Sequence, residues 1–298
     1  MVEDVTDRRA GWVDRAAYPF ESRFLDLPEG TVHYVDEGPA DSEVTLLFLH
    51  GNPTWSFLYR HLVRGLRDEY RCVALDHLGF GLSEHPEGFS CLPSDYAAVL
   101  EAFAETLGLE AVVPVVHDWG GPIGLSYAVD HPENVRGVVA MNTLCWPVPG
   151  DPWFEAFSRV VGGPLGRVAC ERLNAFVEFV MPLAYADRSR LTPAIREQYR
   201  RQFPPGRRKG TWVFPRAFRT EREWLADLRE RASAIDDHPT LLVWGMEDPL
   251  FRERELRRFE ELFGDARTLE LRGVGHYVPE EAGPALVRPV REFLADLE

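Results

Sequence analysis

One aspartate of this chain stands at the junction of a buried strand and a helix, in the segment Val-Val-His-Asp-Trp-Gly-Gly that contains Asp118. Apolar residues predict a strand over residues 111–118, and helical spacing follows. The sharp turn expected between them would hold the Asp118 side chain beside the N–H groups of the helix start. A carboxylate is ionised at neutral pH, so Asp118 could attack a saturated carbon, expel a leaving group and form an ester. The alternative is that Asp118 only caps the helix, since aspartate favours helix starts.

Hydrolysis of such an ester would need a general base, and His276 is the candidate. It lies in the glycine-rich segment Arg-Gly-Val-Gly-His-Tyr, after the last strand that the sequence predicts. Asp248 follows a strand predicted over residues 240–245 and could orient the imidazole and stabilise its protonated form. Glu247 is the weaker alternative for that acid. A lone histidine and an aspartate before a proline are usually structural, so the assignment depends on finding all three residues together.

The order of these residues along the chain is nucleophile, acid, histidine, which is typical of α/β-hydrolases. Asp118, Asp248 and His276 are therefore predicted to form a catalytic triad. Gly120 and Gly121 supply the small residues that such a turn needs on its helical side. On the strand side, Val116 stands where serine esterases of this fold carry a glycine, so the sequence does not predict a serine esterase.

Two N–H donors are expected beside Asp118. Asn52 follows a His-Gly pair after a strand predicted over residues 44–50, and Trp119 follows Asp118 directly. The backbone N–H groups of Asn52 and Trp119 are the predicted oxyanion hole. Their side chains also carry an amide and an indole N–H, which could bind a departing halide ion. A turn role for Asn52 and a packing role for Trp119 are the alternatives.

Alternating strand and helix patterns must position these residues. They predict an α/β fold in which a mostly parallel central sheet has helices on both faces. The alternation of strands and helices stops after residue 142, and residues 146–215 contain helical stretches and prolines without a convincing strand. The sequence therefore predicts a core domain, residues 1–145 and 216–298, and an inserted helical cap domain, residues 146–215. Four cap phenylalanines either line an apolar pocket or pack in the core: Phe154, Phe157, Phe176 and Phe179.

The strands are expected at residues 24–27, 32–38, 44–50, 71–76, 111–118, 135–142, 240–245 and 266–272, the first two as an antiparallel pair. The helical patterns outside the cap cover residues 55–66, 95–107, 120–132, 222–232 and 252–264, and a further helix closes the chain. Within the cap, helical stretches are expected over residues 153–161, 170–180 and 193–203.

Composition excludes several classes of function. A net charge of −15 over 298 residues disfavours nucleic acid as a partner. No run of about 18 apolar residues could cross a membrane, and the charged N-terminal segment does not resemble a secretory signal. The four cysteines are scattered, which predicts reduced thiols in a cytoplasmic protein and no closely spaced zinc ligands. They are Cys72, Cys91, Cys145 and Cys170.

Four segments resemble the motifs of haloalkane dehalogenases, in that family's order: HGNPTWSFLYR, DHLGFGLSE, VVHDWGGPIGL and GVGHYVPEE. The resemblance implies hydrolysis of a carbon–halogen bond through an alkyl–Asp118 ester, with His276 as base and Asn52 with Trp119 as halide pair. Some members carry their acid after the strand that ends near residue 142. No carboxylate occurs at residues 141–143 here, so the resemblance implies Asp248. It also implies no cofactor or metal, and as partners a small halogenated alkane, water and halide.

Other activities stay open on the sequence alone. An epoxide hydrolase shares the fold, the triad and the HDWGG turn, and would need cap tyrosines such as Tyr185 and Tyr199 as acids. A fluoroacetate dehalogenase is less favoured, because the HDWGG turn supplies no arginine for a carboxylate. A non-catalytic binder is disfavoured because all triad positions are filled. Trp153 is a further candidate halide donor; substrate size, halide preference and oligomeric state cannot be read from the sequence.

Overall fold

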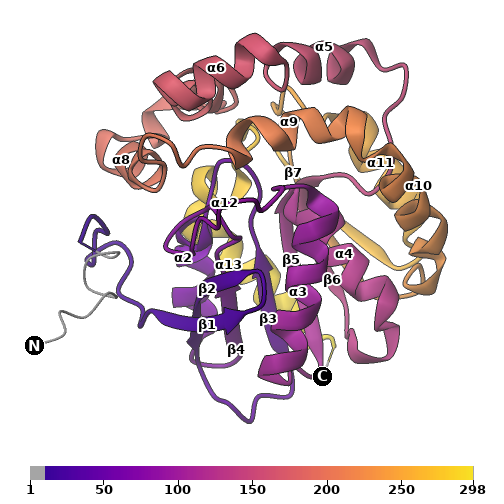
Figure 1. Ribbon diagram of the computed structural model, residues 1–298. Helices are drawn as coiled ribbons and strands as arrows, with labels where there is room; N and C mark the ends of the chain where they lie inside the picture. Colours follow the sequence, from indigo (N-terminus) through magenta and orange to yellow (C-terminus); the bar gives the residue numbers. More distant parts are fainter. Residues whose placement is uncertain (1–10, 298) are drawn as a thin grey trace, which may run out of the picture.

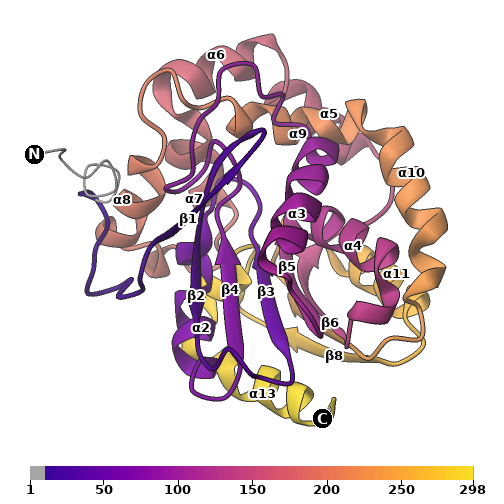
Figure 2. The same cartoon turned by 60° about the horizontal axis from the view of Figure 1, so that its bottom comes forward.

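The fold is built on a single sheet of eight strands in the order β1-β2-β4-β3-β5-β6-β7-β8 (Figures 1 and 2). The computed structural model describes residues 11–297. β1 and β2 pair antiparallel, as do β2 and β4, and every other neighbouring pair is parallel. The strands are β1 (Arg23–Leu27), β2 (Gly30–Glu37), β3 (Thr45–Leu49), β4 (Arg71–Leu75), β5 (Val112–Asp118), β6 (Val138–Thr143), β7 (Thr240–Gly245) and β8 (Ala266–Leu271).

Burial of the central strands explains their sequences. Every residue of β3, β5, β6 and β7 is buried, as expected for parallel strands that are covered on both faces. The strand expected from residue 135 begins later, at Val138, because Val135 makes only an isolated bridge to Val112. The α/β class predicted from the sequence, with its mostly parallel sheet, is confirmed.

Helices cover the two faces of the sheet. On one face α3, α4 and α10 pack together, and on the other α2 packs with α13 (Figure 2). The bounds of the helices around the sheet are α2 (Arg60–Leu66), α3 (Pro93–Leu107), α4 (Gly120–Asp130), α10 (Arg222–Arg231), α11 (Glu253–Leu262), α12 (Val278–Glu281) and α13 (Val287–Ala295).

A layer of helices lies above the sheet in Figure 1. The chain forms no strand between Leu144 and Pro239, the stretch that contains this layer and α10. The layer comprises α5 (Pro152–Val160), α6 (Pro164–Leu173), a π-helical turn (Phe176–Val180), α7 (Met181–Leu183), α8 (Pro193–Arg201) and α9 (Gly210–Thr220). The helical stretch expected over residues 170–180 is not continuous, because Asn174 adopts a positive φ of 53° and ends α6. The expected domain boundary at residue 215 falls inside α9, and the division into core and cap stays a prediction.

Over residues 11–297, no helix is both long enough and apolar enough to cross a membrane.

Candidate active site

The candidate site lies where the strand order reverses. The chain passes from β3 to β4 on one side and then returns to β5 on the other side of β3. In parallel sheets such a reversal leaves a crevice outside the carboxyl ends of the strands. Asn52 follows β3, Asp118 ends β5, Asp248 follows β7 and His276 follows β8. The structure therefore brings together at this crevice residues that lie up to 224 positions apart along the chain.

Asp118 is held in a strained turn between β5 and α4. Its φ is +53°, a backbone conformation that residues other than glycine rarely adopt, and its side chain is buried. Neighbouring glycines make room for the turn. A Cβ atom on Gly51 would lie 2.1 Å from Oδ1 of Asp118, and a Cβ atom on Gly120 would lie 2.0 Å from the carbonyl oxygen of Leu49. Larger residues at these two positions would push the carboxylate out of place.

The surroundings of Asp118 favour a reactive carboxylate. The backbone N–H of Asn52 donates to Oδ1 of Asp118 over 2.7 Å. Burial raises the pKa of Asp118 from 3.8 to about 6, although the charge of His276 and the N–H groups of Asn52 and Trp119 oppose this rise. At neutral pH the group is therefore ionised but poorly solvated, which suits a nucleophile.

His276 lies between two carboxylates. Its Nδ1 atom is 2.8 Å from Oδ2 of Asp248, and its Nε2 atom is 3.6 Å from Oδ2 of Asp118. Burial by itself lowers the pKa of His276, but the charges of Asp248 and Asp118 and the hydrogen bond to Asp248 raise it above 6.5. With Nδ1–H donating to Asp248, Nε2 is left free on the side of Asp118, as base catalysis at an Asp118 ester requires.

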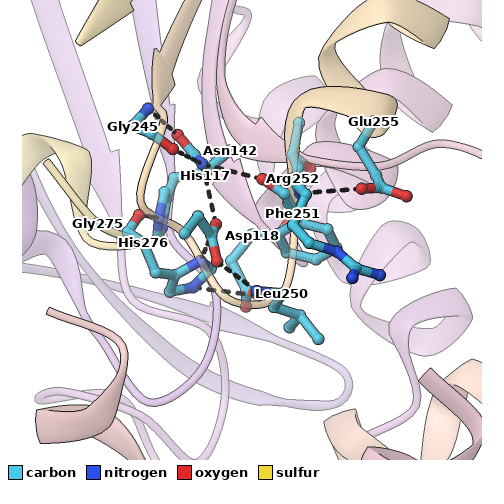
Figure 3. A network of polar contacts seen from close by, with 12 residues as sticks. His117, Asp118, Asn142, Gly245, Leu250, Phe251, Arg252, Glu255, Gly275 and His276 are labelled. Atoms are coloured by element: carbon cyan, nitrogen blue, oxygen red, sulfur yellow. Dashed lines mark hydrogen bonds and ion pairs between the residues drawn. The ribbon is translucent and has the colours of Figure 1, made fainter. Parts of the chain in front are cut away.

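A set of hydrogen bonds fixes Asp248 and the histidine loop, and Figure 3 labels Asn142, Leu250 and His276 among the residues that take part. Asn142 donates to Oδ2 of Asp248 over 2.9 Å, and the Leu250 N–H donates to Oδ1 over 2.7 Å. On the other side, Nε2 of the buried His117 lies 2.8 Å from the carbonyl oxygen of His276. Sequence reasoning missed Asn142 and His117, and their positions at the ends of β6 and β5 are the signal that could have found them.

Glu247, the alternative acid, does not take part in this arrangement. Its Oε2 atom accepts hydrogen bonds from the backbone N–H groups of Gly273 (2.8 Å) and Val274 (3.2 Å). Its carboxylate therefore braces the turn before the histidine and does not contact the imidazole.

An apolar cavity of about 260 Å³ opens beside Asp118. Its polar wall consists of Asn52, Asp118, His276 and the indole of Trp119, with Tyr277 and Trp153 adjoining. The rest of the wall is formed by Phe157, Val161, Phe176, Val180, Leu183, Ala184, Pro215, Phe218, Pro249 and Leu250. Such an apolar pocket with a few converging polar groups is suited to a small apolar ligand.

The amide of Asn52 and the indole of Trp119, which the sequence predicts as donors to an anion, both belong to residues that line the cavity. Oδ1 of Asn52 is buried without a partner in residues 11–297, while its Nδ2 makes one long contact of 3.4 Å to the carbonyl oxygen of Thr211. That contact leaves the second N–H of the amide unused. Trp119 is almost fully buried, and its ring packs against Phe218 with a centroid distance of 4.7 Å. Trp153 also lines the cavity but is 44% exposed.

The four cap phenylalanines divide into two pairs. Phe157 and Phe176 line the cavity. Phe154 does not line it and packs in the core against Phe218, and Phe179 is exposed. Of the two alternatives left open by the sequence, the pocket wall applies to Phe157 and Phe176 and core packing applies to Phe154, while neither applies to the exposed Phe179. Helical periodicity cannot tell which side of a cap helix faces the pocket.

The two cap tyrosines lie outside the cavity wall. The hydroxyl of Tyr199 donates to Oε2 of Glu280 over 2.6 Å. The hydroxyl of Tyr185 is buried and has no hydrogen-bond partner in the part of the chain that the structure describes. The tyrosine that does line the cavity is Tyr277, which sequence reasoning missed although it follows His276 directly. Among the described residues, no cluster of three His, Cys, Asp or Glu side chains could hold a metal ion.

Comparisons with known proteins agree with this architecture. Residues 44–282 match the family model described as alpha/beta hydrolase fold. "Haloalkane dehalogenase 2" of Mycobacterium tuberculosis (strain ATCC 25618 / H37Rv) is 40% identical over 282 residues, covering 94% of this chain and 96% of that protein. "Cis-3-alkyl-4-alkyloxetan-2-one decarboxylase" of Xanthomonas campestris pv. campestris is 32% identical, covering 93% and 97%. The crystal structure of haloalkane dehalogenase DbeA from Bradyrhizobium elkani superposes with a TM-score of 0.85 at 26% identity, covering 93% and 98%.

Proposed function

Because the chain belongs to the haloalkane dehalogenase family of the α/β-hydrolase fold, we propose that it hydrolyses the carbon–halogen bond of small haloalkanes at Asp118. The observation that carries this proposal is the setting of Asp118, an ionised carboxylate on a strained turn that faces an apolar cavity of about 260 Å³. N–H donors for an anion adjoin it in Asn52 and Trp119. The reaction needs no cofactor, since the nucleophile, the base and the anion donors are all side chains.

In the first step, a carboxylate oxygen of Asp118 attacks the carbon that bears the halogen. A C–O bond forms, the carbon–halogen bond breaks, and the bonding electrons leave with the halide. The Nδ2 amide of Asn52 and the indole N–H of Trp119 stabilise the charge that develops on the leaving halide. The buried wall favours this step, because a carboxylate that is poorly hydrated loses little solvation on reacting.

In the second step, water hydrolyses the alkyl–Asp118 ester. Nε2 of His276 takes a proton from the water, whose oxygen attacks the carboxyl carbon of Asp118. The backbone N–H groups of Asn52 and Trp119 stabilise the oxyanion, and Asp248 stabilises the protonated imidazole. Collapse of this intermediate releases the alcohol, which takes the proton from His276, and leaves Asp118 as a carboxylic acid. Loss of that proton to solvent restores the Asp118 carboxylate.

Epoxide hydrolysis is less well supported than dehalogenation. That reaction would need an acid for the opened epoxide oxygen, and the cap tyrosines Tyr185 and Tyr199 do not line the cavity. The decarboxylase relative raises a different possibility, since its name specifies a four-membered cyclic ester as substrate. The test of function must therefore separate three products.

The test measures bromide release from 1-bromobutane and 1,2-dibromoethane, diol from styrene oxide, and carbon dioxide from a cis-3,4-dialkyloxetan-2-one. Each assay is run at low and at high salt, with Asp118→Ala as the control. We expect bromide from the wild type and none from Asp118→Ala. Diol or carbon dioxide without bromide would overturn the dehalogenase proposal. Bromide release that persists in Asp118→Ala would overturn the assignment of the nucleophile.

A further inference from the structure

The loop that carries His276 follows a strand of the sheet and is also hydrogen-bonded to the cap. The backbone N–H of His276 donates to the carbonyl oxygen of Ala184 over 2.8 Å. Ala184 also lines the cavity, so the segment that forms part of the pocket wall is bonded to the backbone of the histidine. The two segments approach closely at Gly275, where a Cβ atom would lie 2.4 Å from the carbonyl oxygen of Ala184 and 2.6 Å from the amide nitrogen of Ala186.

Glu281 bridges these two segments with its two carboxylate oxygens. Oε1 accepts the N–H of Gly275 over 2.9 Å, on the side of the histidine loop. Oε2 accepts the N–H groups of Ala186 (2.9 Å) and Asp187 (3.1 Å), on the side of the cap. Glu281 ends α12, only five residues after His276, and its side chain is buried. One short helix therefore fixes both the histidine loop and its cap neighbour.

Charge neutralisation does not explain why Glu281 is an acid. Among the described residues it forms no ion pair, and its hydrogen bonds come from backbone N–H groups alone. Its neighbour Glu280 differs, since it is paired with Arg60 and also accepts the hydroxyl of Tyr199. Burial raises the pKa of Glu281 to about 7, against the opposing effect of those N–H groups and of His276. Keeping a buried carboxylate without a direct ion pair is costly. Its three hydrogen bonds to backbone N–H groups instead indicate a role in holding the two segments together.

The three donors explain why a carboxylate is needed here. A carboxylate offers two acceptor oxygens, one for each side of the bridge. Glutamine has almost the same shape, but its NH₂ group would face an N–H group on one side. Such a substitution must weaken either the bond to the histidine loop or the bonds to the cap.

We propose that Glu281 is a positioning residue. It holds His276 at a fixed position relative to the cap segment 184–187, as hydrolysis of the alkyl–Asp118 ester requires. The inference rests on the proposed function, because it assumes that His276 is the base of the second step. Halide displacement uses Asp118, Asn52 and Trp119, and within residues 11–297 the hydrogen bonds of Glu281 go to Gly275, Ala186 and Asp187 instead. Loss of Glu281 should therefore slow the second step and leave the first unchanged.

The experiment compares Glu281→Gln with the wild type, with His276→Phe as the standard for a blocked second step. Glu261→Gln serves as the matched control, since Glu261 is exposed on α11. Rapid mixing with 1-bromobutane gives the rate of the bromide burst, and intact-mass spectrometry of quenched samples gives the fraction of alkylated enzyme. For Glu281→Gln we expect an unchanged burst rate, ester hydrolysis slowed by about tenfold or more, and accumulation of the alkylated protein. Glu261→Gln should behave as the wild type.

Unchanged ester hydrolysis in Glu281→Gln would overturn the inference. An equal loss of rate in both steps, together with a lower melting temperature, would also overturn it, because that result indicates a purely structural role. If Glu281→Gln does not fold, Glu281→Asp keeps the charge but is one methylene shorter, and it should still accumulate the adduct relative to the wild type. Failure of the proposed function looks different, because His276→Phe would then form no adduct either.

Discussion

Asn142 donates its side-chain amide to Oδ2 of Asp248 over 2.9 Å, and the same oxygen lies 2.8 Å from Nδ1 of His276. Asn142 itself is held by Gly245, whose N–H donates to Oδ1 of Asn142 over 2.7 Å. The orientation of Asp248 is thus set from β6 as well as from its own loop. This relationship gives the proposed triad acid a fixed geometry, and it distinguishes Asp248 from its neighbour Glu247.

Asp248→Asn should slow ester hydrolysis on the order of 10³- to 10⁴-fold, as loss of the acid does in other triads. An amide NH₂ at this position would face donors from Asn142 and His276 and would favour the wrong tautomer of the imidazole. Single-turnover kinetics with 1-bromobutane would measure the step. Glu247→Gln is the matched control and should change the rate little, since Glu247 bonds only the turn at Gly273 and Val274. A reversed order of effects would show that Glu247 is the acid.

Trp119→Phe should slow the bromide burst by about tenfold to a hundredfold, because it removes one N–H donor to the departing halide while keeping an aromatic ring. Trp153→Phe makes the same chemical change at a position that is 44% exposed, and it should have little effect. Stopped-flow measurement of the burst with bromide and chloride substrates would compare the two variants. Equal losses in both would add Trp153 to the halide site, and no loss in Trp119→Phe would remove Trp119 from it.

The bromide burst should fall as the pH drops through about 6, because Asp118 must be ionised to attack and burial raises its pKa to about 6. A folded-state pKa above the unfolded value of 3.8 means that the ionised group costs stability above pH 6, and that this cost disappears below about pH 4. Asp118→Asn should therefore be more stable than the wild type at pH 8, by roughly 3 kcal/mol.

Urea unfolding of wild type and Asp118→Asn at several pH values would measure this difference. The advantage of the variant should shrink between pH 6 and pH 4. An advantage that is constant with pH would mean that strain at the positive φ of Asp118, and not its charge, accounts for it.

Tyr199→Phe should leave bromide release unchanged and should lower the free energy of unfolding by about 1.5–3 kcal/mol, since it removes a buried hydrogen bond to the charged Glu280. Tyr185→Phe should be neutral for activity and should not destabilise, because the hydroxyl it removes is buried without a partner in the described part of the chain. Halide assays and thermal unfolding would check both variants. Loss of diol formation in either variant, if diol is formed at all, would instead support an epoxide hydrolase with a cap acid.

The sequence by itself predicted the fold class, the strands of the sheet and the five residues proposed to take part in the reaction. Continuous apolar runs such as those of β3 and β5 give strands that are buried on both faces, and the ends of parallel strands meet at one edge of a sheet. Asn52, Asp118, Asp248 and His276 each follow or end such a strand, so their meeting was predictable from local patterns. Their catalytic roles stay predictions, which the variants above test.

Only the tertiary structure decided which side chains of the cap reach that edge. Periodicity marks an apolar face but does not say what the face packs against, so Phe157 and Phe176 could not be told from Phe154 and Phe179. The bridge from Glu281 to residues 184–187 was equally invisible, because it joins segments about 95 residues apart through backbone N–H groups, which carry no sequence signal. Local pattern thus determined the position of the reacting carboxylate, and long-range packing determined the shape of its pocket and the support of its base.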